Sequence, residues 1–128
     1  MLMIENTGGT FIPPTNLRRK ESLYWVLETI QHPVVFNEDR YPTIFHKAAL
    51  LAWTIITRHV FVDGNKRAAM AGAQVFLLIN NYFLNVSNGE IEEMALKIVA
   101  HREEGFTEEG FREWMEAKSV YFTEVEDI

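Results

Sequence analysis

Hydrophobic residues recur at helical spacing along most of the chain. Residues 17–30 place four of them on one helical face: Leu23, Val26, Leu27 and Ile30. Residues 89–101 and 107–118 show the same one-sided pattern, and Thr107 stands where the second of these helices needs an N-cap. Residues 45–58 and 66–81 are instead apolar on almost every side, which is typical of buried central helices. The pattern predicts an all-α domain built around two core helices.

One short stretch interrupts the helical pattern. Val34, Val35 and Phe36 favour a strand, and residues 37–39 have the composition of a turn. Pro42 forbids a helix through the segment that follows and limits any strand there to an edge. We therefore expect a small β-hairpin flap between the first predicted helix and the first core helix.

Length and composition fit one domain. The 128 residues can bury a single core. Residues 1–16 contain a Gly-Gly and a Pro-Pro pair and are expected to form an irregular arm; residues 17–118 form the domain and 119–128 a C-terminal tail. The chain has no cysteine, which excludes thiolate nucleophiles and zinc-thiolate sites. It shows neither a signal peptide nor an apolar run that could span a membrane, so we expect a soluble, cytoplasmic protein without a membrane partner.

Charge is distributed unevenly along the chain. The net charge is −6, which argues against a general nucleic-acid binder. Residues 58–67, however, carry Arg58, Lys66 and Arg67 against Asp63 alone. A small cationic site in an acidic protein is suited to one anionic ligand of modest size, such as a nucleotide.

The residues at this cationic turn combine into a chemical site. His59 can act as a general base near neutral pH, and the Asp63 carboxylate suits a hard cation such as Mg²⁺. Gly64 allows a ligand to approach the backbone closely where the second core helix begins, and a helix N-terminus binds phosphate. Lys66 and Arg67 oppose the helix dipole unless an anion completes the site. Taken singly, each residue has a simpler reading: Asp63 and Asn65 as turn or capping residues, and His59 as a structural histidine.

The continuous string "HVFVDGNKR" resembles the signature of the Fic/Doc family, roughly H-x-F-x-(D/E)-G-N-(G/K)-R. Similarity to the family extends over about residues 20–115. It implies a Fic/Doc-like helical bundle that uses ATP and Mg²⁺. By this resemblance His59 is the catalytic residue, Asp63 holds the metal, and the phosphates are bound by four residues: Gly64, Asn65, Lys66 and Arg67.

Two positions within the signature resemble the death-on-curing (Doc) type rather than Fic adenylyltransferases. Lys66 stands where Fic enzymes typically have Gly, and Met70 where they carry a second Arg. The Doc type implies phosphoryl transfer to a hydroxyl of a protein target, such as a threonine of the translation factor elongation factor Tu. Transfer of AMP in the Fic manner stays open as an alternative, and so does a non-catalytic binding module.

The resemblance also implies two protein contacts. The flap would dock the protein substrate by strand-like pairing, through the following residues: Phe36, Tyr41, Thr43 and Ile44. The inhibitory pattern (S/T)-x-x-x-E-(G/N) of many Fic proteins has no copy in this sequence. A toxin without its own inhibitory helix implies a separate antitoxin, expected to contain a segment that folds on binding.

Overall fold

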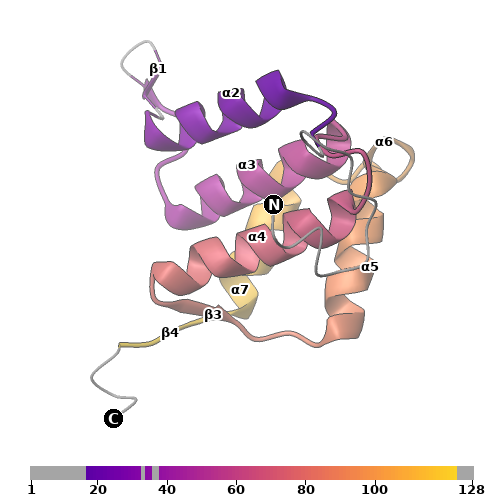
Figure 1. Cartoon of the computed structure of the whole chain (residues 1–128). Helices are drawn as coiled ribbons and strands as arrows, with labels where there is room; N and C mark the ends of the chain where they lie inside the picture. Colours follow the sequence, from indigo (N-terminus) through magenta and orange to yellow (C-terminus); the bar gives the residue numbers. More distant parts are fainter. Residues whose placement is uncertain (1–16, 33, 36–37, 124–128) are drawn as a thin grey trace.

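The computed structural model describes residues 17–32, 34–35 and 38–123, and its described part is mostly helical (Figure 1). The helices, in chain order, are α2 (Lys20–Gln31), α3 (Ile44–Thr57), α4 (Asn65–Ile79), α5 (Asn88–Val99), α6 (His101–Glu104) and α7 (Glu108–Lys118). Two short antiparallel ribbons accompany them, β1 (Val34–Val35) with β2 (Glu38–Asp39) and β3 (Tyr82–Leu84) with β4 (Ser119–Tyr121). The predicted all-α class with a small hairpin is confirmed. The predicted arm, residues 1–16, lies outside the described residues.

The helix ends follow local chemistry. Thr107 caps α7 by accepting a hydrogen bond from the Gly110 N–H at 3.1 Å, as predicted. Ser87 and Glu90 form a reciprocal capping box at the start of α5. The first predicted helix, α2, begins at Lys20 rather than at 17, because Arg18 and Arg19 donate their backbone N–H groups to the Val60 carbonyl instead of turning into a helix.

The predicted hairpin is present but tighter than expected. Glu38 and Asp39, which the sequence places in the turn, form the second strand and pair with Val35 and Val34. The ladder therefore ends before Pro42. Phe36 lies outside the described residues.

The second ribbon is not predicted by the sequence pattern. β3 pairs with β4, whose residues the sequence assigns to the C-terminal tail, so the folded part continues to at least Tyr121. Tyr82 contacts Tyr121 and also Phe45 of α3, with ring centroids 5.2 and 4.9 Å apart. These edge-to-face contacts attach the ribbon to the core.

Helix α3 is the centre of the fold and packs against α2, α4, α5 and α7. Its small residues Ala48, Ala49 and Ala52 are fully buried and allow neighbouring helices to approach closely. Helix α4 differs from the prediction. It was expected to be buried on all sides, but Val75, Leu78 and Ile79 are 48–72% exposed. That prediction is wrong because α3, α5 and β3 cover the opposite side of α4 and leave this face to solvent. No helix in the described part of the chain is long and apolar enough to cross a membrane.

Candidate functional site

The loop between α3 and α4 carries the cationic turn and is anchored from both sides. Val60 and Phe61 are buried in the core. Leu17 forms an isolated β-bridge with Phe61, and the Val60 carbonyl accepts the N–H groups of Arg18 and Arg19 at 2.7 and 3.0 Å. The loop is therefore held by the segment before α2 as well as by its own helices. A site on such an anchored loop keeps its geometry.

Asn65, the first residue of α4, closes the loop on itself. Its side-chain Oδ1 accepts the Phe61 N–H at 2.8 Å, and its Nδ2 donates to the Phe61 carbonyl at 3.0 Å. Both ends of the side-chain amide are thus used to hold Phe61. Asn65 would therefore contact a phosphate through its backbone N–H rather than through its side chain.

Replacing Asn65 by Ala is expected to lower the free energy of unfolding by about 1–3 kcal/mol, because two backbone groups of Phe61 lose their partner. Urea denaturation followed by circular dichroism measures the change. Asn80→Ala is the matched control, since its side chain makes one hydrogen bond within the described part of the chain, to the Phe76 carbonyl. If Asn65→Ala were no less stable than Asn80→Ala, the two hydrogen bonds from the Asn65 side chain to Phe61 would not stabilise the loop.

His59 follows the C-cap residue of helix α3, Arg58, and has a left-handed backbone conformation with φ of 47°. A non-glycine residue in this region carries a cost of about 1–2 kcal/mol. The conformation turns the chain out of the helix, and the imidazole is exposed rather than packed into the core. Strained backbone of this kind is found at functional sites.

The start of α4 is built to receive an anion. Gly64 is the N-cap residue, with φ of 75°, and contributes no side chain to cap the helix. The first turn contains no acidic residue, and Lys66 and Arg67 are exposed there. The N–H groups of the first helical turn and two cationic side chains therefore lie at the same end of the helix. Asp63 precedes them, and its Oδ1 accepts the Gly64 N–H at 2.8 Å.

These residues line one cavity of about 560 Å³, named here the motif cavity. Its wall includes every predicted catalytic, metal and phosphate residue: His59, Asp63, Gly64, Asn65, Lys66 and Arg67. Ile56, Val62 and Val99 supply its apolar part. The volume lies in the range of small-molecule sites.

The motif cavity offers a metal ion one carboxylate. Within the described ranges, no cluster of three or more histidine, aspartate or glutamate side chains could hold a metal alone. Mg²⁺ is commonly bound by one or two carboxylates together with waters and substrate phosphates. Asp63 fits that donor set, and calcium-type or zinc-type sites do not fit it.

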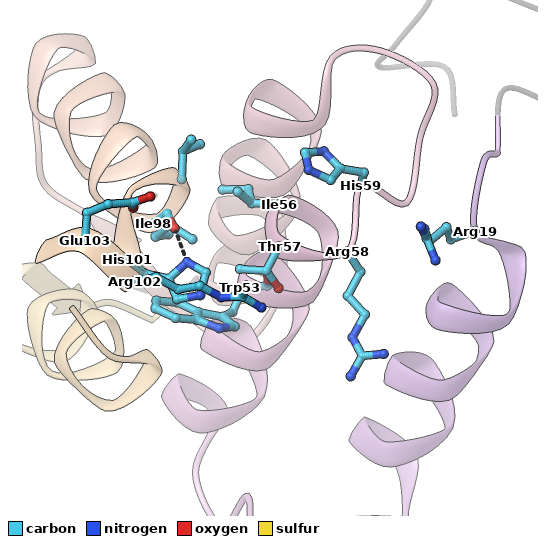
Figure 2. Close-up of a pocket in the computed structure, with 11 residues that line it drawn as sticks. Arg19, Trp53, Ile56, Thr57, Arg58, His59, Ile98, His101, Arg102 and Glu103 are labelled. Atoms are coloured by element: carbon cyan, nitrogen blue, oxygen red, sulfur yellow. Dashed lines mark hydrogen bonds between the residues drawn. The ribbon is translucent and has the colours of Figure 1, made fainter. Parts of the chain in front are cut away.

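Two further cavities adjoin the motif cavity, and the sequence pattern does not predict either. The first, of about 570 Å³, shares His59 with it and is named the arginine cavity after Arg19, Arg58 and Arg102 (Figure 2). The second, of about 490 Å³, shares Lys66 and Arg67 with it and is named the distal cavity. Its other lining residues are mainly apolar or uncharged: Met70, Ala71, Gln74, Asn88, Ile91 and Ala95, with Glu92. The three cavities therefore follow one another from Arg58 past His59 and Lys66 to Met70.

The predicted docking residues lie elsewhere. Thr43 caps α3 and Ile44 is its first residue, whereas His59 follows its last turn. The 14-residue helix separates them by roughly 21 Å, and Figure 1 shows the hairpin and the α3–α4 loop at opposite ends of α3. The structure does not bring Tyr41, Thr43 or Ile44 together with His59.

Tyr41 instead lines a fourth cavity, of about 340 Å³, with His46, Glu108 and Arg112. Burial raises the pKa of Glu108 and of Tyr41, and the Glu108 charge raises the pKa of Tyr41 further. Burial and the nearby Arg112 lower the pKa of His46, whose Nδ1 lies 2.6 Å from the Thr43 hydroxyl. These shifts come from packing between α3 and α7, and His46 has a structural role at the start of α3.

The sequence is similar to known proteins. The model of the Fic/DOC family matches residues 2–77. The curated protein Toxin Doc of Mycolicibacterium smegmatis is 48% identical over 46 residues, which is 36% of this chain. The match spans about a third of that relative (35%). No solved structure matches the chain significantly. Since the family model covers more than half of the sequence, the chain belongs to the Fic/DOC family.

Proposed function

We propose that this protein is a Doc-type phosphotransferase, which moves the γ-phosphoryl group of ATP to a hydroxyl of a protein target. The observation that carries the proposal is the motif cavity, where a histidine, a carboxylate and a cationic helix N-terminus line one volume. This combination supplies a base, a metal ligand and a phosphate cradle, the parts that phosphoryl transfer requires.

The order of the cavities supports transfer of phosphate rather than AMP. The distal cavity begins at Lys66 and Arg67 and is lined mainly by uncharged side chains, which suits a nucleoside. With the nucleoside there, the triphosphate extends over Lys66 and Arg67 towards His59, and the γ-phosphate reaches His59 first. An ATP molecule in the opposite direction would present its α-phosphate to His59. The AMP-transfer alternative therefore requires the nucleoside to occupy the arginine cavity.

Each side chain has a role in this proposal. A ring nitrogen of His59 accepts the proton of the target hydroxyl, and the oxygen of that hydroxyl forms a bond to the γ-phosphorus. The bond from that phosphorus to the β–γ bridging oxygen breaks, and ADP leaves. Lys66, Arg67 and the backbone N–H of Asn65 hold the phosphates. Asp63 would hold Mg²⁺, which neutralises phosphate charge when bound.

The family resemblance and the name of the partial relative support a toxin function. A translation factor such as elongation factor Tu is then the proposed target, and a separate antitoxin the proposed partner. The sequence contains no inhibitory (S/T)-x-x-x-E-(G/N) pattern that could replace such a partner.

The test uses the purified chain, Mg²⁺, bacterial extract and ATP labelled at either the γ- or the α-phosphate. Label on protein is expected from the γ position alone, and His59→Asn should abolish it. Label from the α position would replace the proposal by AMP transfer. Absence of both labels, in extract free of antitoxin, would favour a binding module.

A further inference from the structure

The arginine cavity is cationic although the protein carries a net charge of −6. Its lining includes Arg19 before α2, Arg58 at the end of α3 and Arg102 of α6, against the single carboxylate of Glu103. Figure 2 shows Arg19 and Arg58 on the α2 side of the end of α3, and Arg102 and Glu103 on its α6 side. Like charges gathered around one space are unfavourable without a counter-charge, so the cavity is suited to an anionic ligand.

The three guanidinium groups are not neutralised by the described part of the protein. None of them has a carboxylate oxygen within 4.0 Å among the residues that the structure describes. Arg112, on α7, is the contrast: three glutamates lie 2.9–3.9 Å from its guanidinium. Among the described residues, the arginine cavity contains no such pair, although the Glu103 carboxylate lines it.

Ring contacts and a hydrogen bond fix several side chains at the arginine cavity. Arg58 lies over the Trp25 ring of α2, 5.9 Å from its centroid. His101 donates from Nδ1 to the Ile98 carbonyl at 2.8 Å and contacts the Trp53 ring edge to face, at 5.1 Å. These contacts hold side chains from α2, α3 and α6 in place before any ligand arrives, which lowers the entropy that binding costs.

The position beside His59 indicates which ligand belongs here. In the proposed reaction the nucleotide phosphates occupy the motif cavity, on one side of His59. The acceptor hydroxyl must approach His59 from another side, and the predicted flap is a helix length away. The arginine cavity is the space that shares His59 without Lys66 or Arg67.

Resting on the proposed function, we propose that the arginine cavity binds the acceptor polypeptide and selects acidic side chains next to the modified hydroxyl. Aspartate or glutamate residues of the target pair with Arg58 and Arg102, and this pairing brings the hydroxyl to His59. Carboxylate–guanidinium pairs can be bidentate, which adds orientation to attraction.

The test measures binding without catalysis. Fluorescein-labelled hexaglutamate is titrated with the protein at low salt, and anisotropy gives Kd. The Arg58→Glu/Arg102→Glu variant is expected to bind at least about tenfold more weakly, because two attractive charges become repulsive. Lys118→Glu, with the same charge change per site but at the end of α7 and outside all these cavities, should change Kd little. Equal weakening by Lys118→Glu, or no measurable binding to the wild type, would overturn the proposal.

A second titration separates the two proposals. A fluorescent ATP analogue with Mg²⁺ is bound to the same proteins, and Lys66→Ala should weaken it while leaving hexaglutamate binding intact. Displacement of hexaglutamate by ATP would assign the arginine cavity to the nucleotide and overturn the acceptor site. Tighter binding of hexauridylate than of hexaglutamate would overturn a polypeptide ligand. If the protein bound hexaglutamate but not the ATP analogue, the result would instead count against the proposed phosphotransferase.

In the labelled-extract reaction, the double arginine variant is expected to raise KM for the acceptor and leave KM for ATP unchanged. A change in the KM for ATP alone would contradict an acceptor site.

Discussion

Replacing His59 by Asn is expected to lower the rate of phosphoryl transfer by about 10²–10⁴-fold, the usual contribution of a general base. Asn is chosen because His59 has φ of 47°, a conformation that Asn tolerates better than other non-glycine residues. The imidazole is exposed and lines both the motif cavity and the arginine cavity, so its removal leaves the core intact. The loss is therefore chemical rather than structural.

Single-turnover transfer from γ-labelled ATP measures this rate, and thermal unfolding shows whether the variant folds. His32→Asn is the matched control: it removes an exposed histidine at the end of α2 that lines none of the three cavities. A His59→Asn protein that folds normally and retains most of its activity would remove His59 from the catalytic role.

Phe61→Ala is expected to lower the free energy of unfolding by about 3–5 kcal/mol, the usual cost of removing a buried aromatic side chain. Phe61 is 3% exposed and belongs to the main core. Its backbone also pairs with Leu17 and with the Asn65 side chain. The lost ring therefore weakens the core and the support of the motif cavity together. Since domains of this size are stable by about 5–15 kcal/mol, a large share of the stability depends on this residue.

Urea denaturation of the two proteins, followed by far-ultraviolet circular dichroism, measures the difference. Phe83→Ala provides the comparison, because the Phe83 ring on β3 is 53% exposed and its removal should cost less than about 1 kcal/mol. If both substitutions destabilised the protein equally, Phe61 would not be the anchor of the loop.

Much of the fold follows from patterns that are local in the sequence. Helical periodicity located all the longer helices, and Thr107 marked the start of α7, because periodicity and capping depend on residues a few positions apart. The β3–β4 ribbon was not predicted from the sequence pattern. Its strands are more than thirty residues apart in the chain, and each has only three residues. Pairing over such a distance is decided by packing of the whole chain rather than by a local pattern.

The candidate site divides in the same way. A continuous signature identified His59, Asp63 and the residues up to Arg67, because a single loop and helix start bring them into one cavity. The sequence does not show how far the predicted docking residues lie from His59, because that distance depends on the length and direction of α3. That helix has 14 residues, a length of about 21 Å, so the residues just before its first turn lie at the far end from His59.

The sequence by itself determined the helical class, the family signature and the chemical character of the α3–α4 loop, since each depends on neighbouring residues. The tertiary structure alone decided which distant side chains share a space. It placed Arg19 and Arg102 in one cavity with His59, Met70 in one cavity with Lys66, and the hairpin at the other end of α3 (Figure 1). The physical reason is that a cavity forms where several helices meet, and their crossing depends on the packing of the complete core.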